Sequence, residues 1–182
     1  MEKYIALLRG INVGGHRKIL MADLKQSFKN LGFQNVVSYI QSGNIIFDSL
    51  DKEDRIKLAE RIEEMILEDF GFEVPVIIRT VTEFEDLIQK NPFLQEPNLQ
   101  VENLHLTFLK SIPQRDNLDK INLLSFPLDK FSIVDNNVYL FIPGPYRETK
   151  LGNNLFEKKL NVSATTRTWK TILKLNLLYK KI

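Results

Sequence analysis

Residues 36–48 read "VVSYIQSGNIIFD", in which two runs rich in β-branched and aromatic residues flank Gln41-Ser42-Gly43. Two such runs joined by a short turn with a glycine predict a β-hairpin. Before it, residues 4–9 form an apolar run that is typical of a buried strand, and apolar residues recur at helical spacing over residues 21–31. The chain therefore begins with the order strand, helix, strand, strand.

The same half continues with a helix and a strand. Residues 56–70 carry apolar side chains at helical spacing, with Glu and Lys on the other face. Residues 74–81 indicate a fourth strand. A short helix over residues 82–90 follows, with Thr82 as its N-cap and Glu85 at the capping-box position. This half therefore predicts the order β-α-β-β-α-β and then a helix.

Residues 91–98, "NPFLQEPN", hold two prolines and two asparagines, and this composition predicts a linker. Beyond the linker the order begins again. The expected elements are strands at 104–110, 130–135 and 138–143, and helices at 113–124, 153–160 and 167–179. We therefore predict an α+β protein of two βαββαβ-type domains, residues 1–91 and 98–182. Each domain would layer helices on one face of a mostly antiparallel sheet.

The composition excludes several kinds of chemistry. The sequence has no cysteine, which rules out disulfides, thiolate catalysis and thiolate metal sites. Its 43% hydrophobic and 26% charged residues are ordinary for a globular protein. No segment has the length of a membrane-spanning helix, and the first residues do not resemble a signal peptide. We expect a cytoplasmic protein with no membrane partner.

The charge is unevenly distributed along the chain. Residues 1–91 carry 12 Lys and Arg against 15 Asp and Glu, whereas residues 92–182 carry 13 against 8. Residues 145–182 hold nine cations, with Glu148 and Glu157 as the only anions. A basic segment of this kind attracts phosphates or nucleic acid, and it is also typical of a solvated helix face.

The predicted topology brings two polar turns together. In a split β-α-β unit the first two strands are parallel, and the third strand inserts antiparallel between them. The end of the first strand, residues 9–12, and the hairpin turn, residues 42–44, must then lie at the same edge of the sheet. We expect the two segments to be neighbours, within about one or two strand spacings of about 5 Å.

The turn after the first strand, "RGINVGGHRK" at residues 9–18, has two interpretations. Its spacing from Gly10 to Gly15 fits a P-loop, but His16 and Arg17 stand where a P-loop has Lys and Ser or Thr. A dinucleotide-binding glycine pattern is also absent. One interpretation is therefore an anion site built from backbone amides and the neighbouring cations. The other is that the glycines only supply positive φ angles to the connection.

The segment "TTRTWKTILKLNLLY", residues 165–179, contains the last predicted helix, residues 167–179, preceded by two threonines. Thr165 or Thr166 would be its N-cap, and Arg167 would lie in the first turn, where a cation is unfavourable without an anion. A helix N-terminus beside an arginine suits a phosphate or a carboxylate. We interpret Trp169 as a core residue.

Other chemistry is less well supported by the residue pattern. The two histidines, His16 and His105, fall in different halves, and no spacing typical of metal ligands appears, so we expect no metal and no cofactor. His105 is expected to face outward or to pack as a neutral side chain. A hydrolase triad of Ser42, His16 and Asp48 is conceivable because the two turns meet, although no G-x-S-x-G pattern supports it.

Strand pairs with outward aromatic side chains also occur in RNA-recognition modules of the same element order. Tyr139 and Phe141 alternate along a predicted strand, but the basic-glycine preamble of those modules is missing. We interpret both aromatic side chains as core residues.

Five segments together resemble one known family: "YIALLRGINVGG", "MADLKQSFKNLGF", "VVSYIQSGNIIFDS", "KNPF" and "TTRTWKTILKL". They are similar to the family called domain of unknown function 1697, through nearly the whole chain. The resemblance implies a bacterial-type soluble protein with two ferredoxin-like halves, and no established activity, substrate or cofactor. The chain departs from the family pattern at His16-Arg17 and at Thr168. The pattern emphasises ten residues: Arg9, Asn12, Gly14, Gly15, Ser42, Gly43, Asn44, Thr166, Arg167 and Trp169.

Three classes of function therefore stay open. The first is a binding or regulatory module that holds an anionic ligand, either a phosphorylated metabolite or a nucleic acid, at the glycine-rich loop. The second is an enzyme acting on a phosphorylated or carboxylated small molecule, with catalytic residues unassigned, and the third is a protein–protein interaction scaffold of undetermined oligomeric state. The fold does not choose among them. The expected ligand-binding residues are Arg9, Asn12, Gly14, Gly15, Lys18, Ser42, Asn44 and Arg167.

Overall fold

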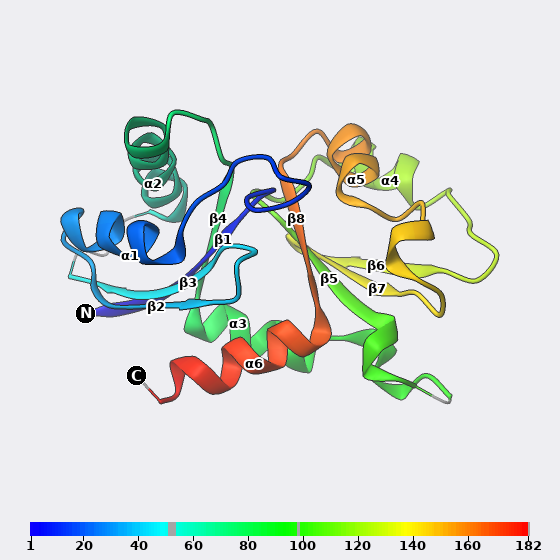
Figure 1. Ribbon diagram of the computed structural model, residues 1–182. Coiled ribbons are helices and arrows are strands. Elements are labelled where there is room, and N and C mark those ends of the chain that lie inside the picture. Colours follow the sequence, from blue (N-terminus) through cyan, green and yellow to red (C-terminus); the bar gives the residue numbers. More distant parts are fainter. Residues whose placement is uncertain (51–53, 98, 182) are drawn as a thin grey trace. The chain divides into compact units, whose positions relative to one another are not determined.

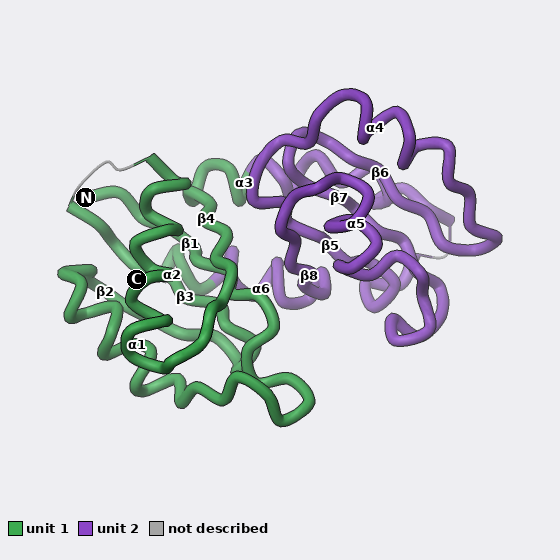
Figure 2. Tube along the Cα trace, turned by 90° about the horizontal axis from the view of Figure 1, so that it is seen from above, with its two compact units in different colours: residues 1–85, 178–182 green, residues 86–177 purple. Residues whose placement is uncertain are grey.

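Two four-stranded sheets, every neighbouring pair of strands antiparallel, organise the protein (Figure 1). The computed structural model describes residues 1–50, 54–97 and 99–181. The chain divides into two compact units, which Figure 2 distinguishes by colour. The first holds residues 1–85 and the end of the chain from Leu178, and the second holds residues 86–177. Asn98, where the predicted second domain starts, lies outside the described residues.

The first sheet belongs to a unit with the predicted element order. Its elements are β1 (Glu2–Leu8), α1 (Met21–Asn30), β2 (Gln34–Tyr39), β3 (Asn44–Ser49), α2 (Arg55–Phe70) and β4 (Val76–Thr80), followed by α3 (Val81–Gln89). The strand order is β2-β3-β1-β4. Because β3 is antiparallel to both β1 and β2, these two are parallel with β3 between them, which confirms the split β-α-β arrangement.

The second sheet has the same topology, with strand order β6-β7-β5-β8. Its elements are β5 (Leu104–Leu109), α4 (Arg115–Ile121), β6 (Lys130–Val134), β7 (Asn137–Phe141), α5 (Asn153–Leu160), β8 (Ala164–Thr168) and α6 (Trp169–Tyr179). Three short 3-10 helices complete it: η1 (Pro92–Gln95), η2 (Val101–Asn103) and η3 (Tyr146–Glu148). The protein is therefore an α+β molecule of two ferredoxin-like halves.

The two halves repeat each other at the level of single hydrogen bonds. The backbone N–H of Leu8 donates to Gly43 O, and that of Leu109 donates to Asn136 O. In the same way Arg79 on β4 lies opposite Ile5, and Arg167 on β8 lies opposite Leu106. Arg9, which follows Leu8, donates its backbone N–H to the carbonyl oxygen of Pro75, the residue before β4. In the second half Lys110, which follows Leu109, donates to the carbonyl oxygen of Ser163, the residue before β8.

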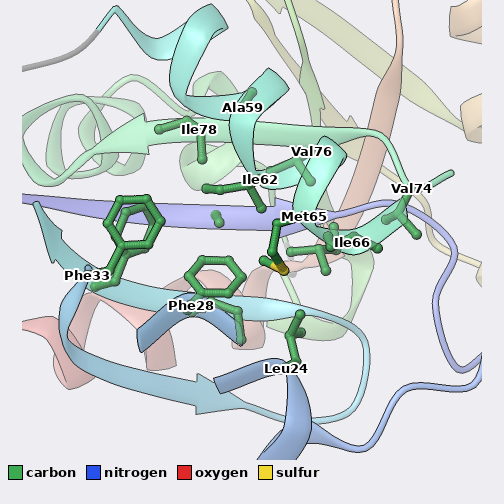
Figure 3. Packing of buried hydrophobic residues seen from close by; sticks show 14 of the residues in the cluster. Leu24, Phe28, Phe33, Ala59, Ile62, Met65, Ile66, Val74, Val76 and Ile78 are labelled. Carbon is green, nitrogen blue, oxygen red and sulfur yellow. The ribbon is translucent and has the colours of Figure 1, made fainter. Parts of the chain in front are cut away.

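Helices α1 and α2 cover one face of the first sheet, where the core of that unit lies (Figure 3). Three aromatic rings lie at its centre: Phe47 of β3 has its ring centroid 4.5 Å from that of Phe33 and 5.4 Å from that of Phe28. The buried side chains of α2 recur at helical spacing, as predicted: Leu58, Ala59, Ile62, Met65 and Ile66.

The ends of α2 follow from its sequence. Asp54 is the N-cap, and its Oδ1 accepts hydrogen bonds from the backbone N–H groups of Ile56 and Lys57 at 2.9 and 3.4 Å. Gly71 has a φ of 78° and ends the helix in the left-handed conformation, which a glycine adopts without strain. In α1, by contrast, the N-cap is Leu20, whose apolar side chain makes no capping hydrogen bond.

The sequence-based prediction was wrong in two places at the ends of the sheets. It missed β8 and placed Arg167 in a helix, whereas Arg167 is a strand residue and α6 begins two residues later, at Trp169. It also placed the capping box of α3 at Thr82 and Glu85. The box is formed by Thr80 and Glu83, since Glu83 N donates to Thr80 Oγ1 at 3.2 Å and Thr80 N donates to Glu83 Oε2 at 2.9 Å.

Within the described ranges, no helix is long and apolar enough to cross a membrane.

Candidate functional site

The glycine-rich loop, residues 9–20, is built around a miniature hairpin. The N–H of Asn12 donates to Arg17 O, and the N–H of His16 donates to Val13 O, both at 3.1 Å. At the tip, Gly14 and Gly15 have φ angles of 60° and 78°, which are the positive values that a type I′ turn requires at both central positions. Two glycines of the loop therefore have a conformational role.

Asn12 fixes the base of this hairpin. Its Oδ1 accepts from the N–H of Ile19 at 2.9 Å, and its Nδ2 donates to Ile19 O at 3.0 Å and to Gln41 O at 2.9 Å. One side chain thus closes the loop on itself and joins it to the β2–β3 turn. Both amide hydrogens of Asn12 are used by the fold.

Gly43 allows the loop and the turn to come close together. Its φ is 78°, and a Cβ at this position would lie 2.6 Å from the Cβ of Leu8 and 3.0 Å from Cδ1 of Ile11. Asn44, which is fully buried, ties the turn from inside, with its Nδ2 donating to Tyr39 O at 3.0 Å and to Ser42 Oγ at 3.1 Å. Asn44 lies opposite Leu7 at the end of β1, so the two polar turns share one edge of the sheet, as the topology predicted.

A hollow of about 380 Å³ lies between the loop, the start of α1 and the β2–β3 turn. It is lined by Asn12, Gly15, Lys18, Ile19, Leu20, Met21 and Gln41. Lys18 is the only charged residue in this lining, and residues 3–22 contain no carboxylate side chain. Since Leu20 and Met21 are the N-cap and first residue of α1, the positive end of the helix dipole adds to the charge of Lys18.

The structure distributes the predicted ligand-binding residues unequally around this hollow. Asn12, Gly15 and Lys18 line it, whereas Gly14 lies at the exposed tip of the hairpin. The sequence reasoning did not find Ile19, Leu20, Met21 or Gln41. One signal was present in the sequence: Leu20 directly precedes a helix at the position where Ser, Thr, Asp or Asn is preferred.

The other predicted residues lie elsewhere in the fold. Arg9 is half-buried. Its backbone N–H donates to Pro75 O at 2.9 Å, which extends the pairing of β1 with β4 by one hydrogen bond. Ser42 and Asn44 hold the β2–β3 turn through their mutual hydrogen bond. Arg167 lies in β8 of the second unit.

Arg167 is buried, with 7% of its surface exposed. Its Nη1 donates to Thr165 Oγ1 at 2.7 Å and to Thr166 O at 2.9 Å. Burial lowers its pKa to about 10, and it lowers that of Arg79, at the equivalent position of the first unit, to about 9. Two equivalent sheets thus each bury an arginine, a repetition that neither half of the sequence reveals alone.

The triad hypothesis of Ser42, His16 and Asp48 is wrong. Asp48 lies opposite Lys3, at the far end of β3, and accepts a hydrogen bond from Asn35 Nδ2 at 2.7 Å. It lies four positions along the strand from Asn44 beside the loop, which corresponds to about 13 Å. Asp48 is therefore out of reach of the two turns.

His105 packs as one of the two expected alternatives, a buried neutral side chain. Its ring stacks on Tyr146, with centroids 4.6 Å apart, and burial lowers its pKa, which a hydrogen bond with the backbone of Asn103 partly offsets. Across residues 1–50, 54–97 and 99–181, no cluster of three or more His, Asp or Glu side chains is arranged to hold a metal ion.

The aromatic residues that invited comparison with RNA-recognition modules do not form a stacking platform. Tyr139 is fully buried beside Trp169, and its hydroxyl donates to Leu87 O at 2.8 Å. Phe141 packs against Phe93, with centroids 6.2 Å apart. Trp169 is 2% exposed and is a core residue, as predicted.

Comparison with known proteins gives a fold and a family. None of the curated proteins compared matches the chain. Among solved structures, the conserved bacterial protein SP0830 from Streptococcus pneumoniae is 26% identical, with a TM-score of 0.77 over 97% of each chain. A family model described as "Protein of unknown function (DUF1697)" matches residues 1–139, so the chain belongs to the DUF1697 family.

Proposed function

We propose that the protein is a binding or regulatory module that holds an anionic small molecule, a phosphorylated or carboxylated metabolite, in the hollow beside the glycine-rich loop. Lys18 would meet the anionic group, together with backbone N–H groups at the start of α1. The edge of the first sheet would then be the ligand-binding part of the protein.

The internal repeat carries this proposal, because the second half shows what the fold requires at the same edge. In that half, residues 110–114 suffice to join β5 to α4, and residues 135–136 join β6 to β7. In the first half the equivalent connections take residues 9–20 and residues 40–43. The sheet closes without the longer segments, and loops beyond what the scaffold needs are a common place for function.

The charges around the hollow favour an anion. Lys18 is exposed at its rim, and none of the lining residues is acidic; Asp23, in the first turn of α1, is the nearest carboxylate in the sequence and lies outside the lining. A lysine beside a helix N-terminus attracts a negatively charged group and disfavours a cation.

A small molecule fits better than a nucleic acid. The lining is a single local hollow of about 380 Å³, which lies within the range of about 300–1,000 Å³ usual for small-molecule sites. Of the two aromatic side chains that would stack bases, Tyr139 is fully buried, and Phe141 is half-buried and packs against Phe93. A nucleic acid would also need several cations along its path.

The test is a titration of the labelled protein with inorganic phosphate, followed by the amide signals of Gly15, Lys18 and Met21. We expect saturable shifts of these signals, and we expect Lys18→Gln to weaken binding by about ten- to a hundredfold, since a hydrogen bond to a charged group contributes about 1.5–3 kcal/mol. Lys29→Gln is the matched control, because Lys29 is exposed in the last turn of the same helix.

The proposal fails if these amides do not respond, or if both lysine variants bind alike. Salt-sensitive retention on heparin that Lys18→Gln abolishes, without any response to phosphate, would instead indicate a nucleic-acid surface.

A further inference from the structure

We infer that the ligand of this hollow is amphipathic: an organic phosphate or carboxylate with a single anionic group and an apolar body that lies on Leu20 and Met21. This inference rests on the proposed function, and it names the class of ligand. It follows from the lining of the hollow, its size and its charge.

Three consecutive apolar residues, Ile19, Leu20 and Met21, belong to the lining of the hollow. Ile19 is buried, with 4% of its surface exposed, and Met21 packs against the core of the first unit. Leu20 stands between them with 72% of its surface exposed. Apolar side chains beside a few polar groups are the usual composition of a small-molecule site, and a bare inorganic anion would leave the exposed Leu20 in contact with water.

Leu20 is out of place by the rules of local structure. It occupies the N-cap of α1, where a Ser, Thr, Asp or Asn side chain would accept a hydrogen bond from the helix, and it makes no such bond. It also gains little burial in exchange. A residue that violates both capping and burial preferences, at a hollow, is expected where function rather than stability selects the side chain.

The size of the hollow exceeds that of a simple anion. Its volume of about 380 Å³ equals that of about a dozen water molecules at about 30 Å³ each. An anionic group held by Lys18 fills a small part of it, and the remainder lies beside the apolar lining residues.

The charge of the lining limits how many anionic groups the ligand carries. Lys18 is the only cation among the seven lining residues, and none of the seven is acidic. One lysine, with the positive end of the α1 dipole, can pair with a single anionic group, whereas a polyphosphate chain would need more cations along its length. A monophosphate ester or monocarboxylate of an apolar or aromatic group matches this arrangement.

The test compares phenyl phosphate with inorganic phosphate in binding titrations with the full chain. We expect phenyl phosphate to bind about tenfold more tightly, because its ring removes apolar surface of Leu20 and Met21 from water. Leu20→Ala, which leaves the N-cap as uncapped as before, should remove most of that preference, measured as the ratio of the dissociation constants of the two phosphates within each protein.

Leu128→Ala is the matched control, since Leu128 is an equally exposed leucine, also at 72%, in the second unit. It should keep the full preference. Equal binding of the two phosphates by the original protein, or a preference that survives Leu20→Ala, would overturn this inference while leaving the proposed anion site intact. Absence of binding by both probes would overturn the proposed function itself.

Discussion

The side-chain amide of Asn12 donates a hydrogen bond of 2.9 Å to the carbonyl oxygen of Gln41, a residue 29 positions later in the chain. This bond joins the glycine-rich loop to the β2–β3 turn at the edge where the hollow lies. Asn12 has a φ of 55°, a left-handed conformation that Asn and Gly adopt more easily than other residues. The residue is therefore suited to its place both by its backbone and by its side chain.

Asn12→Gly and Asn12→Ala separate these two roles. Asn12→Gly keeps the positive φ and removes three side-chain hydrogen bonds, so the free energy of unfolding should fall by about 1–3 kcal/mol. Asn12→Ala should cost a further amount of about 1 kcal/mol, because alanine is strained at this φ. Chemical denaturation of both variants measures the difference. Equal stabilities of the two variants would contradict the role of the backbone.

Gly43→Ala should be one of the most destabilising small substitutions in the first unit. The added Cβ would meet Leu8 at 2.6 Å, and the positive φ adds backbone strain, so we expect a loss of about 2–4 kcal/mol. Gly144→Ala is the control, since a Cβ added at Gly144 meets nothing within 4 Å among the described residues, and the φ of Gly144 is not in the left-handed range. Thermal or denaturant unfolding of both variants tests this. A Gly43→Ala protein as stable as Gly144→Ala would show that β1 and the turn do not approach so closely.

Burial of His105 makes the stability of the protein depend on pH. Its folded-state pKa is lowered below the ordinary value of 6.5, so the unfolded chain takes up a proton at higher pH than the folded chain. The free energy of unfolding should therefore fall as the pH drops below about 6.5, by at most about 1.4 kcal/mol per pH unit from this residue, and level off below the folded-state pKa.

Replacement of the two histidines in turn isolates this effect. His105→Phe keeps an aromatic ring against Tyr146 and should flatten the loss of stability between pH 7 and pH 5. His16→Gln, which removes the other histidine at an exposed position of the loop tip, is the comparison variant. Denaturant unfolding over this pH range measures both. Identical pH profiles for His105→Phe and the original protein would refute the assignment.

The first half of the fold could be predicted because its information is local. Apolar periodicity located each helix and strand, and the handedness of the crossover then placed residues 9–12 beside residues 42–44. The register Leu7 opposite Asn44 is the observed form of that expectation. The prediction concerned backbone topology, which leaves the destination of each side chain undetermined.

Strand β8 could not be predicted by the same means. It reads Ala-Thr-Thr-Arg-Thr, and its buried positions include Thr165 and Arg167, so the alternation of apolar and polar residues that marks a strand is absent. The β-branched threonines were the remaining signal. The predicted helix starts too early, at Arg167, and this error suggested that Arg167 lies in a first helical turn and binds an anion. Only the pairing of β8 with β5 shows that Arg167 is a strand residue.

The capping box of α3 illustrates a different limit. The sequence "TVTEFE" contains the Thr-x-x-Glu spacing twice, at Thr80 with Glu83 and at Thr82 with Glu85. Spacing alone cannot choose between them. Strand β4 ends at Thr80, and this end selects the pair Thr80 and Glu83 as the capping box. Glu85 takes no part in the box and forms a hydrogen bond with Tyr179 instead.

Glu85 is bonded instead to the end of the chain, and this predicts a measurable titration. The hydroxyl of Tyr179 donates to its Oε1 at 2.6 Å, and Lys180 Nζ lies 3.1 Å from the same oxygen. The hydrogen bond from Tyr179, and then the one from Lys180, lower the pKa of Glu85 below its usual value of 4.5. Tyr179→Phe should therefore raise this pKa, and the carbon signal of the Glu85 carboxyl group, followed through an acid titration, measures it.

The sign for stability follows from the same shift. A lowered folded-state pKa stabilises the protein above the unfolded-state value, and this contribution is lost as the pH falls through the folded-state pKa. The original protein and Tyr179→Phe should therefore differ in the free energy of unfolding at neutral pH and approach each other in acid. Tyr39→Phe, at the end of β2, is the control and should leave the titration of Glu85 unchanged. If the Glu85 signal titrates at the same pH in Tyr179→Phe, the hydroxyl does not hold this carboxylate.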